Sequence, residues 1–168
     1  EGGAVPVAVL GPLGPVLVEL SVPDEVFEIQ VHGRKAGHGH SGQRLALALH
    51  GTKREEIERG QQLVAADSLV GTRRLDLRLN LMPHYRGKVK NRQRLHVHHA
   101  GREVLGRIVL LDEKELDGDS GPRTALAQLH LEDQLVAARG DRLVLRFYSP
   151  VTSLAGGIVL DPQGQTVE

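Results

Sequence analysis

Apolar and polar residues alternate along much of the second half of the chain. Between Leu75 and Leu81 every second residue is a leucine, and polar or charged residues separate them. The same period of two recurs over 95–98 and 142–147. This period is typical of antiparallel strands that bury one face and expose the other, so these stretches predict strands.

Shorter apolar runs, bounded by glycine or proline, extend this pattern over the rest of the chain. They are Val16–Leu20, Val26–Val31, Leu45–Leu49, Val104–Leu111, Leu126–Leu131 and Gly157–Leu160. Strands of this length and spacing are typical of barrels and sandwiches. A different signal comes from Thr52 and Glu55, which have the spacing of a helical capping box and predict a short helix at 53–59.

The amino-acid composition argues against several classes of protein. The 168 residues include no cysteine, which excludes disulfide frameworks, thiol nucleophiles and cysteine-ligated metal sites. No run of 18 apolar residues occurs, so no membrane span is expected. Two Phe, two Tyr and no Trp argue against sugar-binding or single-strand stacking platforms. The chain begins at Glu1 without a signal-peptide pattern, and we expect it to be a fragment.

The charges are segregated although the net charge is zero, with 21 basic and 21 acidic residues. Residues 72–94 contain eight Lys or Arg and one acid, a net charge of +7. Residues 112–133 contain seven acids and two bases, a net charge of −5. The basic stretch Tyr85–Arg94 is expected to join two strands. It is open to two interpretations, a phosphate-binding segment or a solvated charged loop.

Motifs of common enzyme sites are missing. No G-x-x-x-x-G-K-[ST], H-E-x-x-H or G-x-S-x-G occurs, so we expect no catalysis by this chain itself. A metal site is an alternative, because His96 and His98 would project from one strand face and His38 and His40 form a second pair. No third ligand is marked by its spacing, and strand histidines can equally face solvent or RNA.

Three segments of the first half resemble a known family. Gln30–Lys35, Ser41–Leu49 and Arg54–Gly60 are similar to the later part of domain II of elongation-factor-Tu-like translational GTPases. The Gln43-Arg44 pair resembles the form found in selenocysteine-specific elongation factors (SelB). Relatives that carry ordinary aminoacyl-tRNA usually have Asp-Asn at this place.

Four segments of the second half resemble domain III of the same factors. They are Leu95–Ala100, Val104–Leu111, Gly140–Arg146 and Ser149–Pro162. The resemblance implies an all-β fold of two packed antiparallel β-barrels of the domain II and III type, over 1–67 and 72–165. The first barrel would be incomplete, because the family's first strand of domain II, with its Asp-Arg pair, has no counterpart here. The GTPase domain is also missing, and Ala48 stands where the family usually has Asn.

The resemblance also implies a function. The chain would be the tRNA-binding region of a cytoplasmic elongation factor that delivers selenocysteyl-tRNA to the ribosome under GTP control. It would hold no cofactor of its own, since GTP and Mg²⁺ belong to the GTPase domain of the same factor, which is then a further partner. Open strand edges of an incomplete barrel add a strand-exchanged homo-oligomer to the expectations.

The resemblance places Arg44 in the pocket for the selenocysteine side chain. A guanidinium favours an ionised selenol over the neutral hydroxyl of serine, and more so where water is excluded. The residues alone leave open that Arg44 merely starts a strand and pairs with a carboxylate.

In relatives domain III lies along the tRNA, through contacts to phosphates and 2′-hydroxyls. The expected tRNA contacts are Lys90, Arg92, Arg94, Arg107 and Arg146, with Thr152 and Ser153 as hydroxyl donors.

Two alternatives to this function remain. One is a metal-binding barrel in which His96, His98 and one of His38 or His40 are ligands. The other is a partner-binding barrel of another translational GTPase, in which Arg44 has a structural role. No role is assigned to the neighbouring His99.

Overall fold

A computed structural model describes residues 5–8, 26–40, 42–49, 53, 55, 57, 59–64, 69–149 and 152–165. The chain divides into two compact units, Glu1–Val64 and Ala65–Glu168. All elements of the described residues are strands, which confirms the all-β prediction, and no helix among them is long and apolar enough to cross a membrane. Thr52 and residues 54, 56 and 58 of the predicted helix, and the run Val16–Leu20, lie outside the described residues.

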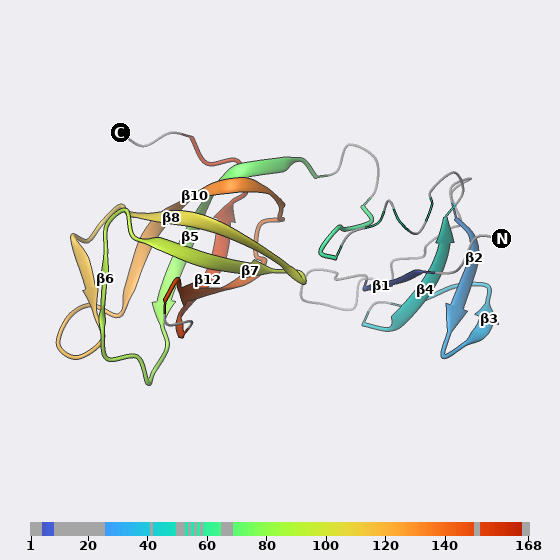
Figure 1. The fold of residues 1–168 in the computed structure, drawn as a ribbon, viewed down its shortest axis with the longest axis horizontal. Coiled ribbons are helices and arrows are strands. Elements are labelled where there is room, and N and C mark those ends of the chain that lie inside the picture. The colour runs from blue at the N-terminus through green and yellow to red at the C-terminus, as the bar shows by residue number, and fades with distance from the viewer. Residues whose placement is uncertain are drawn as a thin grey trace. The chain divides into compact units, whose positions relative to one another are not determined.

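The first unit carries an antiparallel sheet of four strands in the order β1-β4-β2-β3 (Figure 1). The strands are β1 (Val5–Ala8), β2 (Val26–Val31), β3 (Arg34–Ala36) and β4 (Arg44–Leu49). The turn between β2 and β3 consists of His32 and Gly33, with φ angles of 50° and 75°. Two consecutive positive φ angles are typical of the type I′ hairpin turn, which matches the twist of the strands it joins.

One face of this sheet packs into a small apolar core. Leu45 and Leu47 of β4 pack against Ile29 of β2, and all three are buried. Since successive side chains of a strand point to opposite faces, Arg44 and Ala46 lie on the other face. This face carries the hollow beside Arg44 that is described below.

The second unit contains a closed antiparallel barrel of six strands in the order β10-β5-β12-β11-β7-β8, with β8 also paired to β10 (Figure 1). The alternation predicted from the sequence is present, since Leu75, Leu77 and Leu79 are fully buried inside the barrel. The barrel strands are β5 (Gly71–Leu81), β7 (Arg94–His99), β8 (Arg102–Leu110), β10 (Thr124–Val136), β11 (Arg142–Phe147) and β12 (Ser153–Asp161).

A two-stranded sheet packs against the barrel core. It consists of β6 (Lys88–Lys90) and β9 (Glu115–Asp117), and its Val89 and Leu116 are fully buried in the core of the barrel. The basic stretch that was expected to be a connection therefore contains a strand of its own. The packing of two barrels against one another stays a prediction.

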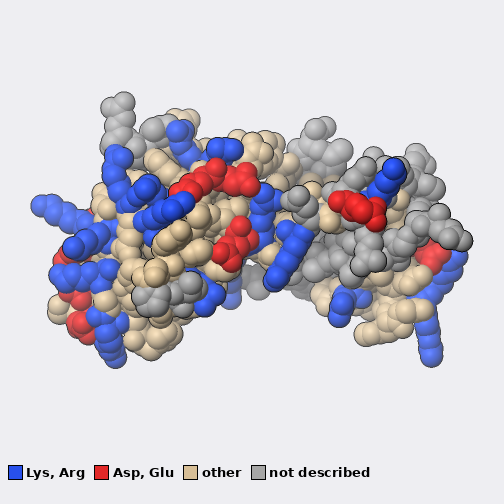
Figure 2. All heavy atoms as spheres, viewed as in Figure 1, with Lys and Arg blue, Asp and Glu red and all other residues tan. Residues whose placement is uncertain are grey.

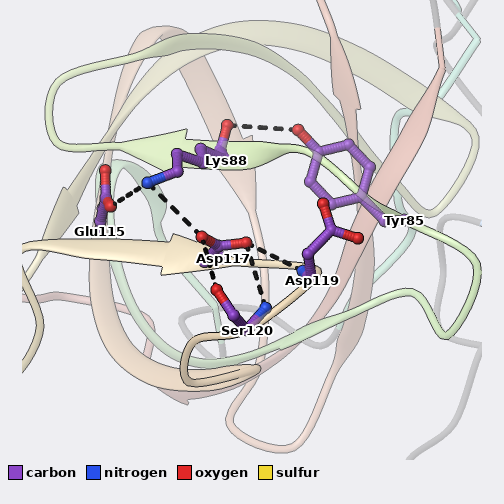
Figure 3. A network of polar contacts seen from close by, with 6 residues as sticks. All are labelled: Tyr85, Lys88, Glu115, Asp117, Asp119 and Ser120. Carbon is purple, nitrogen blue, oxygen red and sulfur yellow. Dashed lines mark hydrogen bonds and ion pairs between the residues drawn. The ribbon is translucent and has the colours of Figure 1, made fainter.

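Polar contacts tie this small sheet to the adjoining turns (Figure 3). Lys88 Nζ lies 2.6 Å from Glu115 Oε1 and 3.5 Å from Asp117 Oδ2. Tyr85 Oη donates to the Lys88 carbonyl at 3.2 Å. The Asp117 carboxylate accepts the backbone N–H of Asp119 at 2.9 Å, and this bond, the N–H of Ser120 and the charge of Lys88 lower the pKa of Asp117.

Candidate functional site

Four adjacent strands of the barrel bring basic side chains into one row on its outer surface. The register pairs Arg74 with His130, His130 with Arg107, and Arg107 with Arg94. The residue that follows each of the four is buried in the core, so the four side chains point outward. Neighbouring strands lie about 4.8 Å apart, so these four residues form a compact cationic row across β5, β10, β8 and β7.

The end of β6 and the turn between β6 and β7 add two cations near this cationic row. The carbonyl of Arg92 accepts a hydrogen bond from Arg107 Nη1 at 3.1 Å, and Arg92 has a positive φ of 63°. Lys90 ends β6 and is exposed. Among the described residues, the side chains of Lys90, Arg92 and Arg74 have no carboxylate partner. Figure 2 shows basic side chains spread over the barrel unit, with fewer acidic groups between them.

Arg94, at one end of the cationic row, is already paired. Its Nε and Nη2 donate to the two carboxylate oxygens of Glu132, at 2.7 and 2.5 Å. These bonds raise the pKa of Arg94 and lower the pKa of Glu132. The Arg94 guanidinium also lies over the ring of Tyr148, 4.9 Å from its centroid. A ligand phosphate would therefore have to compete with Glu132 for this guanidinium.

His96 and His98 project from the same outer face of β7. His96 Nδ1 lies 2.5 Å from Glu103 Oε1, and His98 Nδ1 lies 3.7 Å from the other carboxylate oxygen of Glu103. The His96 ring stacks on Tyr148 with centroids 5.3 Å apart. Burial and the nearby charge of Arg146 lower the pKa of His98. The pair therefore belongs to a local network with a carboxylate and an aromatic ring.

The remaining predicted tRNA contacts lie beside this histidine pair. Arg146 is opposite His96 and opposite Ser153 in the register, and its Nε is buried without a hydrogen-bond partner among the described residues. Thr152 is exposed, and its carbonyl accepts the N–H of Phe147 at 2.9 Å. Arg146, Ser153 and Thr152 thus form a separate group at the ends of β11 and β12.

The structure brings four of the predicted residues together and adds two that sequence reasoning missed. Lys90, Arg92, Arg94 and Arg107 lie in or next to the cationic row. Arg74 and His130 complete it. Arg74 lies within the region 72–94 whose net charge is +7, whereas the position of His130 depends on strand pairing. Its neighbour Arg107 is 23 residues away in the sequence (130 − 107).

Arg44 lies on the face of the first unit's sheet that is opposite its apolar core. It lines an open hollow of ≈ 360 Å³ together with Gln30, His32, Gly33, Leu45 and Ala46. Arg44 is exposed, and its guanidinium has no carboxylate partner in the part of the chain that the structure describes. The alternative in which Arg44 pairs with a carboxylate is thus not seen there, and its role in a selenocysteine pocket stays a prediction.

The metal-binding alternative gains no support. The described residues hold no group of three or more His, Asp or Glu placed to bind a metal ion. The rings of His38 and His40 lie 5.0 Å apart in an edge-to-face arrangement. His99 is buried, and its Nε2 lies 3.0 Å from Asp141 Oδ2. His99 is therefore held by a carboxylate of its own unit.

Comparison with known proteins identifies the barrel. A family model described as "Selenocysteine-specific elongation factor, beta-barrel domain" (Beta-barrel_SelB) matches residues 74–166, which is more than half of the chain. The fold and this match define a β-barrel segment of a translation elongation factor. The chain belongs to the selenocysteine-specific elongation factor (SelB) family.

Curated relatives agree with this assignment. The selenocysteine-specific elongation factor of Desulfomicrobium baculatum is 32% identical over 143 residues, covering 85% of this chain and 22% of the relative. The factor of Escherichia coli K12 is 30% identical over 149 residues, with coverage of 87% and 22%. The chain therefore spans about a fifth of the length of the curated relatives it matches.

A solved structure shows a similar fold. The apo form of translation elongation factor SelB from Methanococcus maripaludis superposes with a TM-score of 0.68, covering 82% of this chain and 33% of that one. The sequence identity of 17% limits this comparison to the fold.

Proposed function

We propose that this chain is the tRNA-binding region of a selenocysteine-specific elongation factor, with a domain II-like first unit and a domain III-like second unit. The complete factor would deliver selenocysteyl-tRNA to the ribosome in the cytoplasm. Its GTPase domain, outside this chain, would supply GTP control and be a further partner. The part proposed for this chain is binding rather than catalysis.

The observation that carries the proposal is the cationic row with its unpaired neighbours. Arg74 and Arg92 have no carboxylate partner among the described residues, and Arg107 bonds only to a backbone carbonyl there. The positive charges of Arg74, Arg92 and Arg107 repel one another, and phosphates relieve that repulsion. The cationic row extends across four strands, so it offers a broad surface to a ligand. Such a surface suits a nucleic acid that is recognised by its shape, through contacts to its backbone.

Arg44 supports the amino-acid part of the proposal. Arg44, whose guanidinium has no carboxylate partner among the described residues, lines an open hollow together with the small Ala46. A selenol ionises near neutral pH, so it would pair with this cation, whereas the neutral hydroxyl of serine would leave the cation without a counter-charge. Such a difference in pairing is the basis on which a site rejects the wrong substrate.

The RNA-binding part is tested by salt-dependent binding of the full chain to tRNA. Affinity should fall linearly with the logarithm of the salt concentration, because each phosphate contact releases counterions. Arg74→Gln and Arg107→Gln should each reduce the slope by about 1. Arg142→Gln is the matched control, because Arg142 is exposed on β11, a strand outside the row. Absence of binding at low salt, or equal effects of all three variants, contradicts the proposal.

The pocket part is tested in a complete factor that carries these barrels. Arg44→Ala should lower the preference for selenocysteyl-tRNA over seryl-tRNA by about tenfold or more, the usual effect of losing one decisive polar contact. Arg34→Ala is the control, since Arg34 is an exposed cation of the same sheet that does not line the hollow. An unchanged preference in the Arg44 variant rejects the pocket role.

A further inference from the structure

His130 lies in the middle of the cationic row, and a glutamine fixes its neutral tautomer. Gln128 is fully buried, and its Nε2 donates to Asp76 Oδ1 at 2.7 Å and to the carbonyl of Gln165 at 2.6 Å. Both of these oxygens only accept, so the amide oxygen of Gln128 must be the atom 2.7 Å from His130 Nε2. That oxygen needs a donor. The neutral ring therefore carries its proton on Nε2 and a lone pair on Nδ1.

The surroundings favour the neutral form of this ring when no ligand is bound. Burial and the positive charges of Arg74 and Arg92 lower the pKa of His130, while the charge of Asp76 acts in the opposite direction. The charged groups that face the ring are Arg74 and Asp76 from β5, Arg107 from β8, Arg92 from the β6–β7 turn and Glu132 from β10 itself.

A phosphate at the cationic row reverses this balance. The lone pair of Nδ1 has no hydrogen-bond partner among the described residues, and it would repel a phosphate oxygen. Once Nδ1 takes a proton from solvent, it donates a charge-assisted hydrogen bond to that oxygen, and the Nε2–H bond to Gln128 is kept. Phosphate also counters the charges of Arg74 and Arg92, which oppose protonation of the ring.

We propose that His130 is a proton-linked phosphate contact, which takes up one proton when RNA binds at the cationic row and so makes the affinity of this surface depend on pH. The inference rests on the proposed RNA-binding function of the row. His130 would contact RNA only when its ring is protonated. The arginines on either side of it, in contrast, are charged at every physiological pH.

The test is calorimetric titration of the full chain with deacylated bulk tRNA at one low salt concentration. Near pH 6.5, binding heats in two buffers of different ionisation enthalpy give the number of protons taken up, and wild type should exceed His130→Gln by up to about one proton. Gln at this position keeps a neutral donor for Gln128 but cannot be protonated. Wild-type affinity should also rise as the pH falls, by at most about tenfold per pH unit for one proton.

Two further variants separate the role of His130 from that of other histidines. His130→Lys should bind at neutral pH at least as tightly as wild type, and the pH dependence due to residue 130 should be lost. His84→Gln, in an exposed turn outside the cationic row, should behave as wild type. His96 and His98 are present in every variant, so their contribution cancels in the comparison.

The outcomes distinguish the two proposals. Tight, salt-dependent binding with equal proton uptake by wild type and His130→Gln overturns the role of His130 and leaves RNA binding intact. Absence of tRNA binding at low salt overturns both. Greater uptake by wild type than by His130→Gln, together with normal uptake by His84→Gln, supports the inference.

Discussion

Arg94 and Glu132 form a bidentate ion pair that spans a strand. Arg94 begins β7 and Glu132 lies in β10, while β8 runs between these two strands in the barrel. Glu132 therefore neutralises Arg94, at one end of the cationic row, although β8 separates the strands that carry these two residues. Because Arg94 is paired and Arg107 bonds only to a carbonyl among the described residues, we expect Arg107 to contribute more to phosphate binding than Arg94.

Removal of the Glu132 charge should strengthen RNA binding. In Glu132→Gln the Arg94 guanidinium becomes free, and a negative charge that faces Arg107 is lost. Affinity for tRNA should rise several-fold, and the salt slope should steepen by about 1 as one more phosphate contact forms. Fluorescence anisotropy over a range of salt concentrations measures both quantities. An exposed ion pair adds little to stability, so the fold should be unaffected.

Glu113→Gln is the matched control for this prediction. Glu113 lies in the loop before β9 and carries the same charge, but it has no ion pair with the cationic row among the described residues. Its loss changes the net charge by the same amount. Equal effects of the two variants would point to net charge alone and contradict the specific role of Glu132.

The buried amide of Gln128 should contribute to the stability of the barrel unit. Gln128→Leu would leave the carbonyl of Gln165 and the Nε2–H of His130 without their partner. Loss of a partner from a buried polar group costs about 1–3 kcal/mol, so the free energy of unfolding should fall by this amount. Denaturant unfolding measures it, with Gln134→Leu on the exposed part of β10 as the control. Equal losses in both variants argue against the network.

The period of two in the sequence predicted the strands of the barrel because it follows directly from burial of one face. Leu75, Leu77 and Leu79 are fully buried, and His96 and His98 share a face as predicted. The segregated charges were harder to interpret. The basic and acidic stretches pair with one another in the fold, through Lys88 with Glu115 and through Arg94 with Glu132.

The composition of the cationic row could not be predicted in the same way. It depends on which residue of one strand lies opposite which residue of the next, and the alternation alone does not specify that register. A shift of one residue in β10 would place buried Leu129 or Leu131 where His130 now lies. Gln128 sets the tautomer of His130, and the orientation of the Gln128 amide depends in turn on the carbonyl of Gln165. Gln165 lies 37 residues after Gln128 in the chain.

Acid should destabilise the barrel unit partly through Asp117. Hydrogen bonds from backbone N–H groups and the charge of Lys88 hold the pKa of Asp117 below its ordinary value. A carboxyl with a lowered pKa in the folded state stabilises the fold above its unfolded pKa, and this stability is lost as the pH falls through the folded pKa. The unfolding free energy of wild type should therefore decrease below about pH 4, where an unperturbed Asp titrates.

Asp117→Asn should remove part of this acid dependence. The variant should be less stable than wild type at neutral pH, and the difference should shrink as the pH falls below about 4. Asp112→Asn is a control for the general effect of charge, since Asp112 accepts the N–H of Leu126 and lies in an exposed turn away from Lys88. A constant difference between Asp117→Asn and wild type at all pH values would contradict this assignment.

Gly118 should be required for the packing of the small sheet on the barrel. A Cβ at Gly118 would clash with the backbone carbonyl oxygen of Tyr85, and a backbone oxygen in a hydrogen-bonded turn cannot move aside as a side chain can. Overpacking of this kind costs about 1–3 kcal/mol, so Gly118→Ala should lower the free energy of unfolding by that amount. Gly156→Ala is the control in the same unit, since its nearest contact would be the Leu143 carbonyl at an ordinary 3.9 Å. Gly156→Ala should change stability by no more than about 0.5 kcal/mol, and similar losses in both variants would show that the turn at Gly118 can rearrange.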